Sequence, residues 1–142
     1  MFVLQLEFDS LQIGTVFQAV ANCFGSIAAE TGSYPYQGIE TLEDLFPAVQ
    51  KIAAEWKEIS PSYAFIFERR WTPFHFDFLI TLPSQDVIIL VRRGSIRVNF
   101  GRDSQSLSNE MVNKLSATSV DELKMYDENW RTVERKVSSP SY

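Results

Sequence analysis

The sequence predicts an α+β fold, in which helices pack on one face of an antiparallel meander sheet. Two observations lead to this class. Three segments carry apolar residues at helical spacing, and residues 62–101 form four short alternating segments separated by turn residues. The predicted element order is β-α-α-β-β-β-β-α. Because 142 residues are the length of one ordinary domain, we expect residues 1–137 to form a single α+β domain and residues 138–142 to be a frayed tail.

The first sixty residues predict one strand and two helices. Residues 2–8 alternate between apolar and polar side chains, as a half-buried strand does. Apolar residues three or four positions apart then predict one helix over residues 13–28 and a second over about 41–59. Thr41 and the acid three residues later fit a capping box. Pro47 is tolerated only near a helix start, so we place it in the opening turn after a short separate turn.

The centre of the chain predicts four strands. They span residues 62–71, 74–82, 87–93 and 95–101. If residues 72–73 make a two-residue turn, Phe67 lies opposite Phe78, and a similar turn at residues 93–94 joins the last two strands. One face of the meander then collects the residues of the expected core: Tyr63, Phe65, Phe67, Trp71, Phe74, Phe76, Phe78, Ile80, Val87, Ile89, Val91, Ile96, Val98 and Phe100.

The last forty residues predict two helices. A short one covers residues 106–115, and a longer one begins at a capping box formed by Ser119 and Glu122. Apolar side chains follow at steps of three and four residues: Leu123, Tyr126, Trp130, Val133 and Val137. This spacing is typical of a helix that packs on a partner surface, and either this helix or a second copy of the chain would cover an aliphatic patch of the sheet.

The second face of the meander is the candidate binding site. It carries an aliphatic patch made of Ile66, Leu79, Ile88 and Leu90. Beside the patch lie the residues that we expect to contact a partner or ligand: Glu68, Arg70, His75, Asp77, Arg92, Arg97 and Asn99. An apolar patch with a charged rim is typical of a recognition surface. The alternative is a solvated outer face with cross-strand ion pairs.

The expected register brings two carboxylates together on this face. Glu68 is expected opposite Asp77, and Arg70 opposite His75. Facing carboxylates destabilise a sheet unless cations neutralise them. Arg92 is expected on the other side of Asp77, so Arg92 and Arg70 are the available cations.

Charge is distributed unevenly along the chain. The formal net charge is -5, from 18 acids and 13 bases. Residues 62–102 nevertheless hold six arginines, three acids and no lysine, whereas residues 1–61 hold eight acids and two lysines. Arginine makes planar bidentate contacts and is enriched at interaction surfaces. The overall acidity argues against nucleic acid and anionic membranes as partners.

The residues available for chemistry are few. Cys23 is the only cysteine and His75 the only histidine, so an internal disulfide, a thiolate metal cluster and a HExxH site are excluded. No glycine-rich phosphate loop or GxSxG motif occurs. His75 with Asp77 could act in acid–base chemistry, and Glu68 with Asp77 could bind Mg²⁺, although the neighbouring arginines compete with a divalent cation. We therefore expect no catalytic residue, no metal and no cofactor.

Nothing in the sequence predicts export or a membrane span. The longest aliphatic run, Val87–Val91, is far too short to cross a bilayer, and the first residues lack the basic region of a signal peptide. A single free thiol fits a reducing compartment, so we expect a cytoplasmic protein.

These observations favour a small acidic protein-binding module that acts by occlusion, as an immunity protein, an inhibitor or an adaptor does. It would use the arginine-bearing sheet face and the acidic helical zone, and a homodimer through the aliphatic patch is a further expectation. The alternative is a small-ligand-binding protein or enzyme, because the element order resembles helix-grip folds with fewer strands. In that case Arg70, His75, Asp77 and Arg92 would line the pocket.

Overall fold

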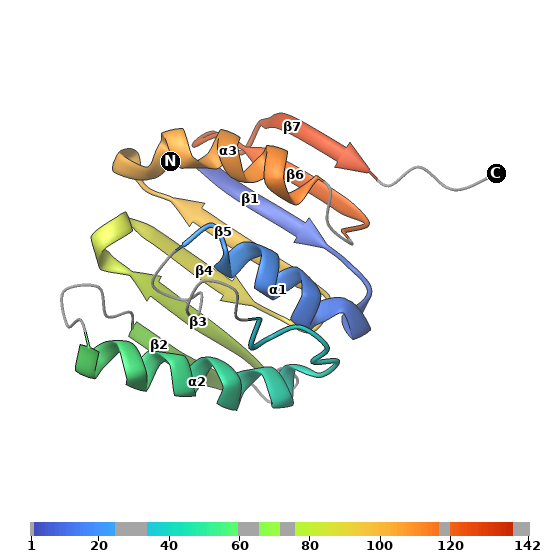
Figure 1. The fold of residues 1–142 in the computed structure, drawn as a ribbon. Helices are drawn as coiled ribbons and strands as arrows, with labels where there is room; N and C mark the ends of the chain where they lie inside the picture. The colour runs from blue at the N-terminus through green and yellow to red at the C-terminus, as the bar shows by residue number, and fades with distance from the viewer. Residues whose placement is uncertain (1, 25–33, 60–65, 72–75, 117–119, 138–142) are drawn as a thin grey trace.

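The computed structural model describes residues 2–24, 34–59, 66–71, 76–116 and 120–137. It confirms the α+β class: within these residues, three α-helices lie on one face of a seven-stranded antiparallel sheet (Figure 1). The strands are β1 (Phe2–Glu7), β2 (Ile66–Trp71), β3 (Phe76–Leu82), β4 (Val87–Val91), β5 (Ser95–Phe100), β6 (Glu122–Tyr126) and β7 (Thr132–Val137). The helices are α1 (Ile13–Ala21), α2 (Leu42–Ile59) and α3 (Gln105–Leu115), with short 3₁₀ turns η1 (Ser10–Gln12), η3 (Pro83–Gln85) and η4 (Arg102–Ser104).

The strand order across the sheet is β2-β3-β4-β5-β1-β6-β7. The predicted meander therefore forms as β2 to β5, and β1 joins its far edge. β1 pairs on one side with β5 and on the other with β6, so Leu6 lies between Ile96 and Leu123. On the helical face, α2 contacts β2 and β3, α3 contacts β1, and α1 lies between the other two helices (Figure 1).

The core lies between this helical layer and the sheet. The fully buried side chains of the sheet include Leu4, Leu6, Phe78, Ile80, Ile89, Val91, Ile96, Val98 and Phe100. The expected stripe of α1 meets them with Ile13, Val16, Phe17 and Val20. At roughly 1.5–3 kcal/mol for each large side chain removed from water, this layer is the main source of stability. The face assigned to the core by alternation is confirmed for the described side chains of β3, β4 and β5.

The segment after α1 is held against that helix by its backbone. The Gly14 N–H donates to the Ile39 carbonyl oxygen at 3.0 Å, and a Cβ at Gly14 would overlap the carbonyl oxygens of Tyr36 and Ile39. The buried Gln18 accepts the Tyr36 N–H on Oε1 at 3.0 Å and donates from Nε2 to Asn22 Oδ1 at 3.0 Å. A glycine and a buried amide are therefore required where two chain segments meet this closely.

Two helix boundaries differ from expectation. α1 ends at Ala21 rather than near residue 28, and residues 25–33 lie outside the described residues. α2 is continuous from Leu42, with Thr41 Oγ1 accepting the Asp44 N–H at 3.1 Å, so the Thr41 half of the predicted capping box forms. Pro47 lies inside this helix rather than in its opening turn. Pro47 has no N–H to donate to the carbonyl oxygen of Glu43, four residues earlier. Because Glu43 lies in the first turn, near the exposed helix start, the missing hydrogen bond is tolerated.

α3 matches the short helix predicted over residues 106–115. None of the helices in the described part of the chain is long and apolar enough to cross a bilayer.

The predicted C-terminal helix is wrong. Residues 122–137 form the β6–β7 hairpin, and Glu122 begins a strand rather than taking part in a cap. The apolar residues that suggested a helix lie in a segment that also alternates as a strand does. In that strand, Leu123 and Met125 point to one face and are buried in the core. Asp127 decides between the two structures, because its side chain accepts backbone N–H groups two and four residues later and so closes a turn.

The predicted register of the first hairpin is also wrong, by two residues. Phe67 pairs with Ile80 rather than with Phe78, and the pairing ends at Trp71 opposite Phe76. Four residues, 72–75, separate the strands, and they lie outside the described residues. Because the shift is even, the parity of the backbone pairing between β2 and β3 stays as predicted and only the paired residues change. The register of β4 with β5 is confirmed.

Candidate functional site

The sheet face that points away from the three helices is the candidate site, here called the open face. Strand pairing arranges its described residues in three rows that cross the sheet. The uncharged row contains Thr81, Ile88, Asn99, Val3, Tyr126 and Thr132. The middle row contains Leu79, Leu90, Arg97, Gln5, Lys124 and Arg135. The third row contains Asp77, Arg92, Ser95, Glu7 and Glu122.

The aliphatic patch lies where it was predicted. Leu79 pairs directly with Leu90, and both are half-buried. Ile88 follows on β4 with 40% of its surface exposed, which places it among the most exposed large apolar residues described. Ile66 lies opposite Thr81 by backbone register, although its side chain lies outside what the structure describes. The described helices lie on the other side of the sheet, so they do not cover this patch.

Asp77 is almost completely buried near the start of β3, with 5% of its surface exposed. The Arg92 Nε lies 3.4 Å from Asp77 Oδ2, as the sequence predicted, while Oδ1 has no hydrogen-bond partner in the structure. The backbone of Arg70 lies opposite Asp77 on β2, whereas Glu68 lies opposite Leu79. The expected pair of facing carboxylates is therefore wrong: by register, Asp77 lies between two arginines.

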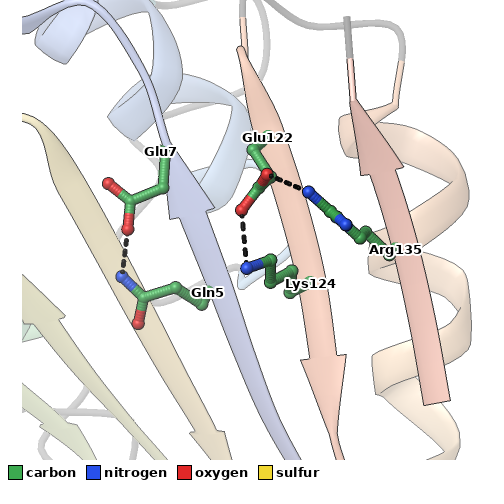
Figure 2. A network of polar contacts seen from close by, with 5 residues as sticks. All are labelled: Gln5, Glu7, Glu122, Lys124 and Arg135. Carbon is green, nitrogen blue, oxygen red and sulfur yellow. Dashed lines mark hydrogen bonds and ion pairs between the residues drawn. The ribbon is translucent and has the colours of Figure 1, made fainter. Parts of the chain in front are cut away.

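A chain of polar contacts crosses the middle of the open face. Arg97 donates from Nε to Gln5 Oε1 at 2.9 Å, and Gln5 donates from Nε2 to Glu7 Oε1 at 3.0 Å. Figure 2 shows the Gln5–Glu7 part of this chain in front of the strands, with the helices behind them. Arg97 is thus held by its own protein and half-buried, rather than extended to meet a partner.

The polar contacts continue onto the C-terminal hairpin. Glu122 accepts from Lys124 at 3.0 Å and from Arg135 at 3.1 Å (Figure 2). These hydrogen bonds, with Lys124 contributing most, lower the pKa of the Glu122 carboxyl. Glu122 also lies directly opposite Glu7, so its two cations offset a like-charge pair that would otherwise weaken the β1–β6 pairing.

Two features distinguish the uncharged row. Asn99 is half-buried between Ile88 and Val3, and its Oδ1 is buried without a hydrogen-bond partner in the structure. At the other end of the row, the Tyr126 ring lies 6.0 Å from the ring of Trp130, which is 62% exposed in the turn between β6 and β7. Val3, between Asn99 and Tyr126, is buried with 5% of its surface exposed, so the large exposed apolar side chains along this row are Ile88 at one end and Trp130 at the other.

The structure brings together four of the seven predicted site residues. Their side chains lie on the open face: Asp77, Arg92, Arg97 and Asn99. Glu68 and Arg70 occupy the adjoining β2 by register, and His75 lies outside the described residues. The prediction missed the contributions of β6 and β7 because it treated residues 119–137 as a helix. It missed that of β1 because it did not place this strand between β5 and β6. The polar–apolar alternation of residues 122–126 was the available signal.

Other groups considered for chemistry occupy structural positions. The Cys23 thiol is half-buried, donates to the Ala19 carbonyl oxygen at 3.4 Å, and has its pKa raised by burial. It is therefore held protonated and poorly nucleophilic. Among the described residues, no three His, Cys, Asp or Glu side chains gather closely enough to hold a metal ion.

The polar candidates do not face the helices. A helix-grip pocket would lie between the helices and the sheet, where the described buried side chains are mainly apolar, with Gln18 and Ser108 as the buried polar residues of the helices. Asp77 and Arg92 lie on the opposite side, on the open face. Comparison of the chain with models of known protein families, with curated proteins and with solved structures finds no match in any of the three.

Proposed function

We propose that this protein is a protein-binding module that acts by covering the surface of a partner, in the manner of an immunity protein, an inhibitor or an adaptor. The open face is its binding surface. One observation carries the proposal: all three described helices lie on one side of the sheet, and the other side displays an aliphatic patch beside immobilised charges. Exposed apolar surface with a polar rim is typical of interaction sites.

The charged residues of the open face are suited to the rim of such a surface. Arg92, Arg97 and Arg135 are each oriented by a contact within the protein. Side chains that are ordered before binding lose less conformational entropy when a partner arrives. Their role is therefore to orient and select a partner, while affinity comes from the apolar surface between them.

The acidity of the chain supports a partner with a basic surface. Exposed acids at the start of α2, Glu43 and Asp44, belong to the acidic zone of residues 1–61 on the helical side of the molecule. From there their charge attracts a basic partner through the long-range electrostatic field. This attraction raises the rate of association without direct contact between these acids and the partner. The free thiol of Cys23 is consistent with a reducing, cytoplasmic location.

The test compares two matched substitutions. Ile88→Glu places a charge on the open face, and Leu11→Glu places the same charge on η1, where Leu11 is 57% exposed. Wild type and both variants are used to capture proteins from the lysate of the source cell, and the eluted complexes are weighed by native mass spectrometry. Circular dichroism and the melting temperature verify that both variants fold.

We expect a stoichiometric protein partner that Leu11→Glu retains and Ile88→Glu loses. Equal retention by the two variants would contradict the open face as the binding surface. Capture of no protein would contradict the protein-binding function itself. A complex of two copies of this chain, lost in Ile88→Glu, would identify the partner as the chain itself.

A further inference from the structure

The outer edge of β7 has no strand beside it among the described residues. β7 pairs with β6 on one side and ends the strand order of the sheet, at the border of the molecule (Figure 1). The opposite end of the sheet differs, because β2 is contacted by α2. The backbone N–H and C=O groups along a free edge are arranged to pair with one more extended strand. This edge is therefore a surface whose partner must itself be a strand.

Sheet edges are usually protected by charged side chains and by bulges, and β7 has both. Arg135, however, is turned back across the sheet, where its Nη2 donates to Glu122 Oε2 at 3.1 Å (Figure 2). Lys136 is half-buried rather than extended into water. The bulge lies at the start of β7, so Glu134–Val137 pair regularly with β6. The usual protection is therefore weak along the second half of this strand.

The residues of this edge are complementary to a second copy of themselves. Two copies of an edge strand can pair antiparallel about a twofold axis that passes through one residue. With the axis at Arg135, Glu134 lies opposite Lys136 of the partner subunit by register, and this opposite-charge pair occurs twice. Val133, which is 56% exposed, lies opposite Val137 of the partner subunit. Each of these cross-strand pairs favours the same register.

The neighbouring registers lack this complementarity. With the axis at Glu134 or at Lys136, no opposite charges of β7 face each other, and the axis residue meets its own like-charged copy. The axis at Arg135 also brings two copies of Arg135 together. Each copy is held by Glu122 of its own chain, and this contact offsets the like charge. Charge complementarity therefore selects a second copy of the chain in one register.

We propose that two copies of this chain pair antiparallel along β7, about a twofold axis at Arg135, so that their two sheets join into one. The axis is perpendicular to the sheet, which places the open faces of both copies on the same side. The inference goes beyond the proposed function and does not depend on what the open face binds. Because one strand pair is a small interface, the dimer is weak and forms only at high protein concentration.

The test exchanges the charges that the register brings together. Glu134→Lys and Lys136→Glu each turn two opposite-charge pairs into two like-charge pairs, and the double variant restores opposite charges. Dimer dissociation constants are measured by sedimentation velocity at chain concentrations up to about 1 mM. We expect dimers about tenfold weaker in each single variant, and a dissociation constant close to wild type in the double variant. An equimolar mixture of the two single variants should form a heterodimer, because every such pair then joins opposite charges.

The controls separate the edge from the fold and from the open face. By register, residues 134 and 136 lie opposite Met125 and Leu123, so reversing their charges breaks no cross-strand ion pair with β6. Circular dichroism and the melting temperature verify that the variants fold. Lys51→Glu, at an exposed position of α2, should dimerise as wild type does. Ile88→Glu should also dimerise, since Ile88 lies on the open face and far from β7 in the strand order.

A second measurement places the axis directly. Paired residues of antiparallel strands have Cα atoms about 4.5–5.5 Å apart, within reach of a disulfide. In a Cys23→Ser background, Arg135→Cys should therefore cross-link two copies on oxidation. Thr132→Cys in the same background should not, because three residues on each side of the axis separate its two copies by about 20 Å.

Four results would overturn the inference. They are a wild-type chain that stays monomeric at every concentration, a dimer that the double variant weakens as much as the single variants do, and equal cross-linking of Arg135→Cys and Thr132→Cys. The fourth is a dimer that Ile88→Glu abolishes and the charge variants retain, which would assign self-association to the aliphatic patch. None of these results bears on capture of a different protein by the open face, so the proposed function is tested separately.

Discussion

Arg92 and Asp77 form an ion pair whose two members differ sharply in exposure. The Asp77 side chain is 7% exposed and the Arg92 side chain 55% exposed, with 3.4 Å between Nε and Oδ2. A buried carboxylate depends strongly on its cation, because water cannot replace it. This pair therefore affects stability as well as the charge of the open face.

The first prediction concerns this pair. Arg92→Met should lower the free energy of unfolding by about 1–3 kcal/mol, because it leaves Asp77 buried without its described cation. The control is Arg93→Met at the next position, where the ion pair with Glu43 is exposed on both sides and should contribute under about 1 kcal/mol. Urea unfolding of the two variants measures the difference. Equal losses of unfolding free energy in Arg92→Met and Arg93→Met would show that the burial of Asp77 does not make its ion pair more stabilising than the exposed pair of Arg93 and Glu43.

Charge reversal at Arg92 is a poor probe of recognition, because Glu at this position would repel Asp77 and disturb the sheet. Arg97→Glu is more suitable, since Arg97 is held by a neutral amide, that of Gln5. We expect Arg97→Glu to melt closer to wild type than Arg92→Glu does. A lower melting temperature for Arg97→Glu than for Arg92→Glu would contradict the environments described for the two arginines.

The second prediction concerns Trp130. Trp130→Gly should keep or raise the free energy of unfolding, by up to about 1 kcal/mol, because glycine relieves the left-handed strain at φ +59°. Trp130→Val should lower it, because a β-branched residue tolerates positive φ least well. Thermal unfolding of both variants measures the effect. A clear loss in Trp130→Gly would show that the contact with Tyr126 outweighs the strain.

The third prediction concerns acid. The pKa of Asp127 is lowered, first by the Arg131 N–H and also by Asn129, so the folded pKa lies below the unfolded one. Such a group stabilises the fold above its unfolded pKa, about 3.9, and that contribution is lost as the pH falls through the lower folded pKa. Asp127→Asn keeps an acceptor for the turn but removes this proton linkage. Urea unfolding between about pH 2 and 7 should show a shallower acid decline in the variant.

The fourth prediction concerns the packing of α1. Gly14→Ala should destabilise the protein by about 1–3 kcal/mol or more, because its Cβ would overlap backbone oxygens that cannot rotate away. Thr15→Ala, at a half-buried neighbour in the same helix, is the control and should cost less. A stable Gly14→Ala variant would mean that the segment around Tyr36 and Ile39 can move outward.

The alternation of apolar and polar residues predicted the central strands correctly, whereas the spacing of apolar residues near the C-terminus predicted a helix where the structure has a hairpin. The core face of β3, β4 and β5 followed from parity alone, because a one-residue slip would expose the whole apolar set. The register of β2 did not follow, since parity cannot distinguish Phe78 from Ile80 as the neighbour of Phe67. The residues near 123–137 satisfied both helical and strand spacing, and the turn chemistry of Asp127 decided between them.

The candidate site was predicted only where it depends on strands that follow one another in the sequence. Asp77 and Arg92 are cross-strand neighbours within the meander, so local alternation was sufficient to pair them. The uncharged row depends on β1 and β6 lying beside β5, and that is a relationship between distant parts of the sequence. Asn99 could be assigned to the correct face, but its neighbour Val3 could not be foreseen.

The central position of β1 also determines the order in which the sheet can assemble. Its partners are β5, where Leu6 meets Ile96, and β6, where Val3 meets Tyr126. The first strand in the chain must therefore remain unpaired until most of the sequence has been synthesised, and such long-range pairing is slow. β2 to β5 can pair as local hairpins before then. Loss of β1 would divide the sheet into a four-stranded part and a two-stranded part, separating Ile88 from Trp130.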